Sequence, residues 1–274
     1  MIEISNLSNS SALIGLRQRH LKGIDIGYQT LNDRWGICQM QLSDLDVIIL
    51  AGGQGSRIRH LLPEGTPKCM ADIGGQPFLR RLQVHLEDEG FRRFIALVGY
   101  GAEHVYDFYH GGSKEEREAW EKQPSPTVSF HYCDTSKTRI SFVKELRPLG
   151  TAGAILNCIE GISGDLFFVV NGDTYCELDF PDILRSHREI GFDATVPYDP
   201  KRLNGRHAGT YLFSKKAIEA VAYLGPKFDL ADAFAVFPKR GVRVNWYPTD
   251  VPFYDIGSPL GLETFRAYAT GRKW

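Results

Sequence analysis

The chain of 274 residues lacks a surplus of charge of either sign. Lysine and arginine together number 32, against 33 aspartates and glutamates. A balance of this kind provides no overall basic field that would favour a nucleic acid or an acidic membrane surface as the main partner. We therefore expect neither nucleic acid nor membrane among its partners, and any anion that it binds must be held by a local group of basic side chains.

The chain also lacks paired cysteine motifs. No two of its cysteines form a C-x-x-C pair that could hold zinc or carry out redox chemistry. We interpret the thiols as reduced and mostly packed, which predicts a cytoplasmic protein. The five cysteines are Cys38, Cys69, Cys133, Cys158 and Cys176.

Long apolar runs are absent as well. No run approaches the roughly 20 residues that a bilayer-spanning helix needs, and the first residues lack the basic and apolar segments of a secretory leader. We therefore expect neither secretion nor membrane insertion. What the chain does have is 43% hydrophobic and 24% charged residues, a composition typical of a soluble globular protein with a packed core.

From about residue 44 onward, short apolar runs alternate with segments of helical periodicity. This alternation predicts an α/β fold, with a mostly parallel sheet and helices on both faces. In such sheets, ligands bind outside the carboxyl ends of the strands. Strands are predicted at 44–51, 91–100, 127–134, 140–146, 165–170, 194–198, 209–214 and 242–248. Helices are predicted at 77–90, 102–112, 151–162, 181–191 and 215–224. Two further helices are predicted to begin at Ser113, with a capping box to Glu116, and near Pro259.

The first 43 residues differ from the rest, because they are polar and weakly patterned. We predict an N-terminal extension over residues 1–43 and a single domain over residues 44–274. Chain ends are loose unless other segments hold them, so the extension is interpreted as a flexible arm or as an over-long start before Met40. The alternative is a segment that packs on a partner subunit in a homo-oligomer.

An apolar run opens into a glycine-rich and cationic loop in "IILAGGQGSRIRHLLPEGTPKCM". Gly52, Gly53 and Gly55 carry no β-carbons, so backbone N–H groups there can approach an anion closely. Arg57 adds a planar guanidinium that suits phosphate oxygens, and Lys68 adds a compact point charge. Together these groups suit a polyphosphate, although the glycines alone would also fit a tight turn with solvated cations.

Two common phosphate-binding patterns do not fit this loop. The Rossmann fingerprint would need a third glycine where Ile58 stands. The P-loop would need a lysine directly after its last glycine, and no lysine has that spacing here. The sequence therefore argues against a dinucleotide-dependent dehydrogenase and against a P-loop kinase.

The stretch "LAGGQGSRIRHLLPEGTPKCMADIGGQPFL" resembles the signature of the sugar-phosphate nucleotidyltransferases. The likeness continues through "ELRPLGTAGAI", "FFVVNGDTY", "AGTYLFS" and "FYDIGSP" in the same order, over most of residues 45–270. The forms P-L-G-T-A-G-A and N-G-D-T-Y are especially similar to guanylyltransferases that act on mannose 1-phosphate or D-glycero-α-D-manno-heptose 1-phosphate. The resemblance implies a Rossmann-like α/β fold of the nucleotide-diphospho-sugar transferase type and an enzyme that makes NDP-sugars for polysaccharide biosynthesis.

The resemblance also implies a Mg²⁺-dependent reaction, in which a sugar 1-phosphate oxygen attacks the α-phosphorus of a nucleoside triphosphate and pyrophosphate leaves. It assigns Arg57 to the leaving β/γ-phosphates, Lys68 to phosphate oxygens around the reacting centre, and Asp173 with Asp255 to Mg²⁺. Each aspartate follows an apolar or aromatic run, so each is expected at a strand end, where a hard cation could take oxygen ligands. Either aspartate alone would also suit a turn or a helix cap.

In relatives, the residue at the position of Glu145 lies beside the base, and the turn at Gly150 and Thr151 closes over it. An ionised carboxylate can accept hydrogen bonds from N1–H and N2–H₂ of guanine, which favours GTP, while a surface position at a strand end would also account for Glu145. The predicted nucleotide-binding residues are Leu50, Ala51, Gly52, Gly53, Gly55, Ser56, Arg57, Glu145, Gly150 and Thr151.

The sugar side departs from the family pattern. Typical members carry a longer segment with a Y-G turn and an E-K-P motif, whereas only some 34 residues separate Asp173 from "AGTYLF" here. His207 replaces the asparagine of the usual N-A-G, and it either contacts a sugar hydroxyl or packs. The predicted substrate-binding residues are Lys68, Asp173, His207 and Gly209.

The leading hypothesis is thus a nucleotidyltransferase that joins a nucleoside triphosphate to a sugar 1-phosphate. The shortened segment leaves open a non-catalytic nucleotide or nucleotide-sugar sensor. A third alternative is a subunit that assembles through its N-terminal arm with an active homologue and supports it. The presence of Arg57, Lys68, Asp173 and Asp255 together favours the enzyme, because a protein that only binds has less need of all four.

Overall fold

The computed structural model describes residues 40–111, 113–122, 128–135, 138–201 and 207–272. Contacts within the chain separate residues 1–40 from a compact unit over residues 41–274, and only the latter is described below. Nearly all of the predicted extension at 1–43 lies outside the described residues, so that division stays a prediction. Within the described ranges, every helix is too short or too polar to cross a bilayer.

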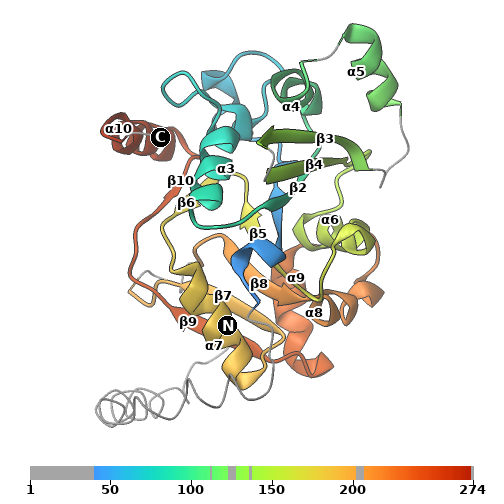
Figure 1. Ribbon diagram of the computed structural model, residues 1–274, viewed down its shortest axis with the longest axis vertical. Helices are drawn as coiled ribbons and strands as arrows, with labels where there is room; N and C mark the ends of the chain where they lie inside the picture. The colour runs from blue at the N-terminus through green and yellow to red at the C-terminus, as the bar shows by residue number, and fades with distance from the viewer. Residues whose placement is uncertain (1–39, 112, 123–127, 136–137, 202–206, 273–274) are drawn as a thin grey trace. The chain divides into compact units, whose positions relative to one another are not determined.

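An eight-stranded mixed sheet forms the centre of the unit, with the order β3-β4-β2-β1-β5-β8-β7-β9 (Figure 1). Strands β1, β2, β4 and β5 pair in parallel, as do β7 and β9, whereas β3 and β8 run antiparallel to their neighbours. The predicted mostly parallel α/β sheet is therefore confirmed. The strands are β1 (Asp46–Leu50), β2 (Arg93–Val98), β3 (Val128–Thr135), β4 (Thr138–Lys144), β5 (Leu166–Asn171), β7 (Ala194–Tyr198), β8 (Thr210–Ser214) and β9 (Val244–Pro248).

Helices cover both faces of this sheet, as the apolar strands predict. Successive side chains on a strand point to opposite faces, and Phe167 and Phe168 of β5 show the two environments. The ring of Phe168 lies 5.2 Å from that of Phe91, just after α3, and 5.5 Å from that of Phe180, where α7 begins. Phe167 instead belongs to a buried cluster with Phe213 and with residues of α6, α8 and α9.

The helices follow the sequence pattern closely, with one exception. The capping box at the start of α5 is present: Ser113 N donates to Glu116 Oε2 at 2.8 Å, and Glu116 N donates to Ser113 Oγ at 3.2 Å. Helix α9 was not among the predicted helices, although Leu230, Ala233 and Phe234 have helical spacing and pack on the core. The helices are α3 (Phe78–Asp88), α4 (Ala102–Tyr109), α5 (Lys114–Glu121), α6 (Thr151–Asn157), α7 (Phe180–Ile190), α8 (Lys215–Glu219), α9 (Leu230–Val236) and α10 (Pro259–Thr270).

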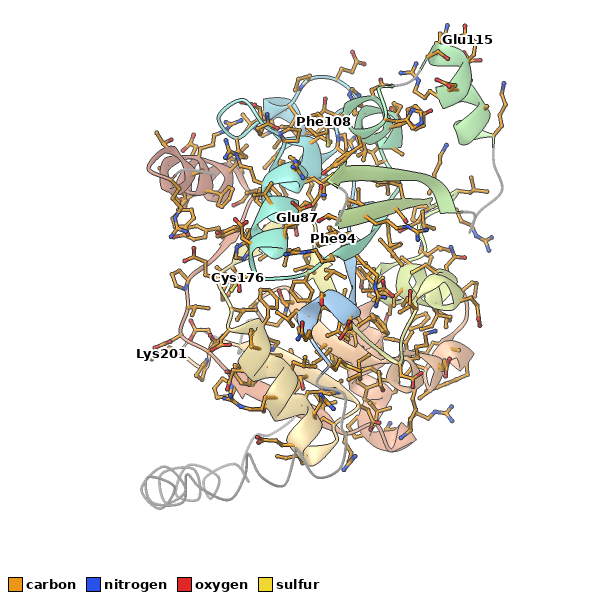
Figure 2. All side chains as sticks on the ribbon, viewed as in Figure 1. Glu87, Phe94, Phe108, Glu115, Cys176 and Lys201 are labelled. Atoms are coloured by element: carbon orange, nitrogen blue, oxygen red, sulfur yellow. The ribbon has the colours of Figure 1, made fainter. Side chains whose placement is uncertain are left out.

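Packing is dense at the centre and looser at the periphery. Figure 2 shows Phe94 of β2 among the packed side chains, while Glu115 projects from α5 at the edge of the unit. Phe94 is fully buried, whereas Phe108 on the neighbouring α4 is 42% exposed. The core therefore lies along the middle of the sheet, where β1 and β5 pair.

A small antiparallel ribbon beside the sheet joins two segments that are distant in sequence. It consists of β6 (Thr174–Cys176) and β10 (Phe253–Asp255). Their register places Asp255 opposite Thr174, and Ile256 N donates to Asp173 O at 2.9 Å. The ribbon therefore brings the two predicted metal-binding aspartates to the same place.

His187 is a buried histidine of α7. Its side chain is only 1% exposed, its Nδ1 lies 2.9 Å from the Thr195 hydroxyl, and its Nε2 has no hydrogen-bond partner among the described residues. Burial lowers the pKa of His187 to about 4, while nearby Asp193 opposes the shift. The imidazole is therefore neutral in the folded chain at neutral pH.

Acid should weaken the fold through His187. In the unfolded chain the imidazole takes up its proton near pH 6.5, but in the folded chain it does so only near pH 4. Protons therefore favour the unfolded state between these values, and about 3 kcal/mol of stability that is present above pH 6.5 is lost by about pH 4. His187→Gln removes this titration. Urea unfolding should show the free energy of unfolding of the wild type falling by about 3 kcal/mol relative to the variant over this range; a difference independent of pH would contradict the assignment.

Candidate functional site

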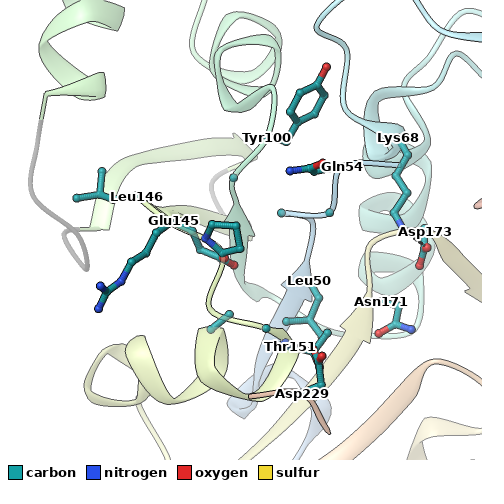
Figure 3. Close-up of a pocket in the computed structure, with 17 residues that line it drawn as sticks. Leu50, Gln54, Lys68, Tyr100, Glu145, Leu146, Thr151, Asn171, Asp173 and Asp229 are labelled. Carbon is teal, nitrogen blue, oxygen red and sulfur yellow. Dashed lines mark hydrogen bonds and ion pairs between the residues drawn. The ribbon is translucent and has the colours of Figure 1, made fainter. Parts of the chain in front are cut away.

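A cavity of about 620 Å³ opens at the carboxyl ends of β1, β2, β4 and β5 (Figure 3). Strand β1 lies between β2 and β5, so the chain crosses to opposite sides of β1 at this point. Open α/β sheets bind ligands at such a switch point. The cavity is therefore the candidate functional site.

The structure brings together about half of the predicted site residues at this cavity. Those that line it are Leu50, Gly52, Gly53, Lys68, Glu145, Gly150, Thr151 and Asp173. Those in the described part of the chain that are outside its lining are Ala51, Gly55, Ser56, Arg57, His207, Gly209 and Asp255. Sequence reasoning did not include the other lining residues, which are Gln54, Gly99, Tyr100, Leu146, Arg147, Pro148, Ala154, Asn171 and Asp229.

The loop glycines make room for Lys68. A β-carbon on Gly53 would lie 3.3 Å from Lys68 Cε, and one on Gly55 would lie 2.9 Å from Lys68 Cβ. Gly55 also has a positive φ of 59°, which side chains disfavour. The lysine stem thus crosses the loop closely and ends in an ion pair with Asp173. These glycines therefore let the Lys68 side chain pass close to the loop backbone. The sequence suggested only that they would let an anion approach it.

The lysine is anchored by the residues next to it. It begins a short 3₁₀ turn, Lys68–Met70, in which Cys69 is buried and its Sγ donates to Ala51 O at 3.8 Å. Burial raises the pKa of the Cys69 thiol to about 12, so this cysteine stays protonated. Ala51 is itself buried in the core, so its role is packing and backbone hydrogen bonding.

Asp173 and Asp255 converge beside Gly257, with Arg57 next to them. A β-carbon on Gly257 would lie 2.8 Å from Asp255 Oδ1, 2.8 Å from Arg57 Nη2 and 3.4 Å from Asp173 Oδ2. Gly257 N donates to Asp255 Oδ1 at 2.7 Å, which fixes that carboxylate in its turn. Glycine therefore keeps a small space open between two carboxylates and a guanidinium.

This arrangement fits a hard divalent cation. Mg²⁺ in nucleotide sites is commonly held by one or two carboxylates, with phosphate oxygens and water as its other ligands. Among the described residues, no group of three or more His, Cys, Asp or Glu side chains forms a complete protein cage. The pair of Asp173 and Asp255 is thus the donor set that the described residues offer to such an ion.

Glu145 forms the wall opposite the glycine loop. A β-carbon on Gly52 would lie 3.1 Å from Glu145 Oε1, so the end of the Glu145 side chain packs closely against the loop at this point. Leu149 N donates to Glu145 Oε2 at 3.3 Å. Burial raises the pKa of Glu145, and the Leu149 N–H opposes that shift. The carboxylate is held by one backbone contact and presents further acceptor positions to the cavity.

The first turn of α6 cannot hold an anion, because its N–H groups are already used. Thr151 N donates to Asp229 Oδ1 at 2.9 Å, and Ala152 N and Gly153 N donate to Phe228 O at 3.2 and 3.0 Å. The cationic group that lines the cavity beside Asp173 is instead Lys68, which is paired with that carboxylate. Lys68 and Asp173 therefore lie on one side of the cavity, whereas Glu145 and Asp229 lie away from them (Figure 3), and Arg147 also lines the cavity.

Gln54 and Tyr100 form a wall that sequence reasoning missed. The guanidinium carbon of Arg59 lies 4.7 Å from the ring centroid of Tyr100. Arg59 Nη2 also donates to Gln54 O and Oε1 at 3.3 and 3.4 Å. Arg59 thus stabilises the loop against the turn after β2. Tyr100 is the last residue of the predicted strand 91–100, so the rule that ligands bind at strand ends could have identified it.

The predicted sugar-side residues lie next to Asp173. A β-carbon on Gly209 would lie 3.0 Å from Thr174 Oγ1 and 3.1 Å from Asn171 Nδ2. His207 Nδ1 lies 2.9 Å from Tyr211 Oη. Burial, with a smaller contribution from the Asp173 charge, raises the pKa of Tyr211. The Tyr211 phenol is therefore close enough to Asp173 for the carboxylate charge to affect its pKa. Its contact with His207 places that histidine in the same part of the site.

The chain resembles known nucleotidyltransferases in sequence and in structure. A family model for the MobA-like NTP transferase domain matches residues 47–240. The chain is 27% identical over 248 residues to mannose-1-phosphate guanylyltransferase catalytic subunit beta of Drosophila pseudoobscura pseudoobscura, covering 79% of this chain and 60% of that protein. It is 28% identical over 246 residues to D-glycero-alpha-D-manno-heptose 1-phosphate guanylyltransferase of Aneurinibacillus thermoaerophilus, covering 78% and 94%.

A solved structure supports the same likeness. HddC from Yersinia pseudotuberculosis, complexed with GMP-PN, is 30% identical to this chain, with a TM-score of 0.61 and coverage of 82% of this chain and 99% of that one. The predicted fold of the nucleotide-diphospho-sugar transferase type is therefore confirmed. The alignment spans only three fifths of the Drosophila protein but nearly all of the two bacterial ones.

Proposed function

Because the chain belongs to the family of MobA-like NTP transferase domains and is a sugar-phosphate nucleotidyltransferase, we propose that it joins GTP to a heptose-type or mannose-type sugar 1-phosphate and releases pyrophosphate. The product would be a GDP-sugar for polysaccharide biosynthesis. The observation that carries this proposal is the polarity of the cavity, which has Glu145 and Asp229 on one side and Lys68, paired with Asp173, on the other.

This polarity sets the direction of the nucleotide. The triphosphate belongs at the glycine loop and Lys68, because the backbone there is free of β-carbons and a cation is present. The base belongs at Glu145, whose carboxylate can accept from N1–H and N2–H₂ of guanine. Uracil and thymine present an acceptor where guanine presents a donor, so an ionised carboxylate would repel their carbonyl groups. This contrast supports GTP over UTP and dTTP.

Catalysis would consist chiefly of positioning and charge neutralisation. The attacking phosphate oxygen is already an anion, so the site needs no general base. Lys68 would hold phosphate oxygens at the reacting centre, and Arg57 would hold the β/γ-phosphates beside the corner at Gly257. Asp173 and Asp255 would hold Mg²⁺, which when bound offsets the charge of the phosphate oxygens.

The sugar would lie beyond Asp173, toward Gly209 and His207. The close approach of Gly209 to Asn171 and Thr174 supports this side. The imidazole of His207, held by Tyr211, offers a hydrogen-bonding group of the kind that sugar hydroxyls need. Heptose and mannose are favoured because the bacterial and Drosophila relatives are named for those substrates.

A pyrophosphate-release screen tests the proposal. Purified protein with Mg²⁺ is assayed with GTP, ATP, UTP, CTP and dTTP, each combined with mannose, heptose and glucose 1-phosphates. We expect release with GTP and with heptose or mannose 1-phosphate, and little with glucose 1-phosphate. Nucleotide binding by calorimetry without turnover in any combination would contradict catalysis and would favour a nucleotide sensor.

A further inference from the structure

Asp229 lies on the same side of the cavity as Glu145, although it comes from a segment that the sequence did not point to. It precedes α9 and lines the cavity together with Glu145 and Thr151. Figure 3 shows it beside Thr151, at the end away from Lys68. We infer that Asp229 is a base-selecting residue that accepts a hydrogen bond from guanine. This inference rests on the proposed function and names a second group that chooses the base.

The hydrogen bonds of Asp229 leave it room for one more donor. Its Oδ1 accepts from Thr151 N at 2.9 Å and from Thr151 Oγ1 at 3.2 Å. Its side chain also accepts from Asp232 N, as the N-cap of α9. An ionised carboxylate offers about four acceptor positions, so about one remains, on a side chain that faces the cavity.

The neighbouring hydroxyl cannot serve that purpose. Thr151 Oγ1 gives its proton to Asp229 and accepts from Leu230 N at 2.8 Å, so it has no proton left for a ligand. Glu145 and Asp229 are therefore the carboxylate acceptors on this side of the cavity, which Arg147 also lines as a donor. A base with several adjacent N–H donors fits these two acceptors best.

Guanine matches this pair of acceptors. Its N1–H and N2–H₂ groups lie along one edge, and Glu145 and Asp229 would share them. Hypoxanthine keeps N1–H but lacks the exocyclic amine, so it would leave one carboxylate without a donor. Because the loss of one hydrogen bond to a charged group lowers affinity, we expect GTP to bind about tenfold more tightly than inosine triphosphate.

The test compares nucleotide affinities of the wild type and Asp229→Asn. Asparagine is as good an N-cap as aspartate, so the caps of α6 and α9 should survive while one acceptor becomes a donor. Calorimetry measures the dissociation constants of GTP, inosine triphosphate and 2′-deoxy-GTP. We expect the GTP preference over inosine triphosphate to fall from about tenfold to near one, with the preference over 2′-deoxy-GTP unchanged.

Asp179→Asn is the matched control. Asp179 caps α7, where it accepts from Asp182 N at 2.9 Å, and it is not part of the cavity lining. All nucleotide ratios should keep their wild-type values in this variant. If Asp229→Asn fails to fold, Asp229→Ser carries the same expectation, because serine is also a preferred N-cap and is too short to reach the base.

Three results would overturn the inference. An unchanged ratio of GTP to inosine triphosphate in a folded Asp229→Asn protein would mean that Asp229 only caps the helices. A changed ratio of GTP to 2′-deoxy-GTP would assign it to the ribose instead. A wild type that binds no nucleotide would remove the proposed function along with the inference, whereas the first two results leave the proposed function standing.

Discussion

Asp173→Asn should lower kcat/KM for pyrophosphate release by about 10³-fold or more. Three features meet at this carboxylate: the ion pair with Lys68, the hydroxyl of Thr174, which donates to Asp173 Oδ1 at 3.3 Å, and the space beside Gly257. Asparagine keeps the shape but removes the charge, so the site loses one of the two carboxylates that would hold the metal. The measurement is steady-state kinetics with GTP and the preferred sugar 1-phosphate.

The same variant should still bind nucleotide. Loss of the Asp173 charge frees Lys68 for phosphate oxygens, so we expect the affinity for GTP in the absence of metal to stay the same or to rise. Asp165→Asn, at the exposed opposite end of β5, is the control and should keep wild-type kinetics. An Asp173→Asn protein that retains activity within tenfold of the wild type would contradict the assignment.

The fold was largely predictable because its signals are local. The apolar strands at the centre are buried on both faces, and continuous apolar runs such as 166–170 indicate this burial in the sequence itself. The cap of α5 also depends on two residues in one turn, Ser113 and Glu116. Helix α9 also has a capping box, formed by Asp229 and Asp232, which the sequence-based prediction did not use. It is only seven residues long, which makes its helical pattern hard to recognise, and its contact with Thr151 at the start of α6 joins segments that are far apart in sequence.

The candidate site was predictable only where a motif marks it. The resemblance pointed to Lys68 and Asp173, and their ion pair explains why the loop beside them is rich in glycine. The meeting of Asp255 with Asp173 depends on the β6–β10 ribbon, whose register cannot be read from either short segment alone. Asp229 contacts Thr151 across 78 positions of sequence, which is why sequence reasoning missed it.

Gly261→Ala should both destabilise the fold and impair the site. Gly261 lies in the first turn of α10, where Ser258 Oγ accepts from its N–H at 3.1 Å. A β-carbon there would overlap the carbonyl oxygen of Asp255. Either α10 or the backbone of Asp255 must move, so we expect a loss of about 2–4 kcal/mol in the free energy of unfolding. We also expect a fall in kcat/KM, because Asp255 would leave its place beside Asp173.

The sign of the change is diagnostic, because helix propensity alone argues the other way. Alanine in a helix is favoured over glycine by about 1 kcal/mol, so a glycine without a steric role should gain stability on substitution. Gly271→Ala, at the other end of α10, is the matched control: its β-carbon would meet no atom within 4 Å, and we expect little change in stability or activity. Chemical denaturation of both variants decides the point. If Gly261→Ala proved as stable and as active as Gly271→Ala, then α10 would not press on Asp255, and the helix would have no part in holding that carboxylate in the site.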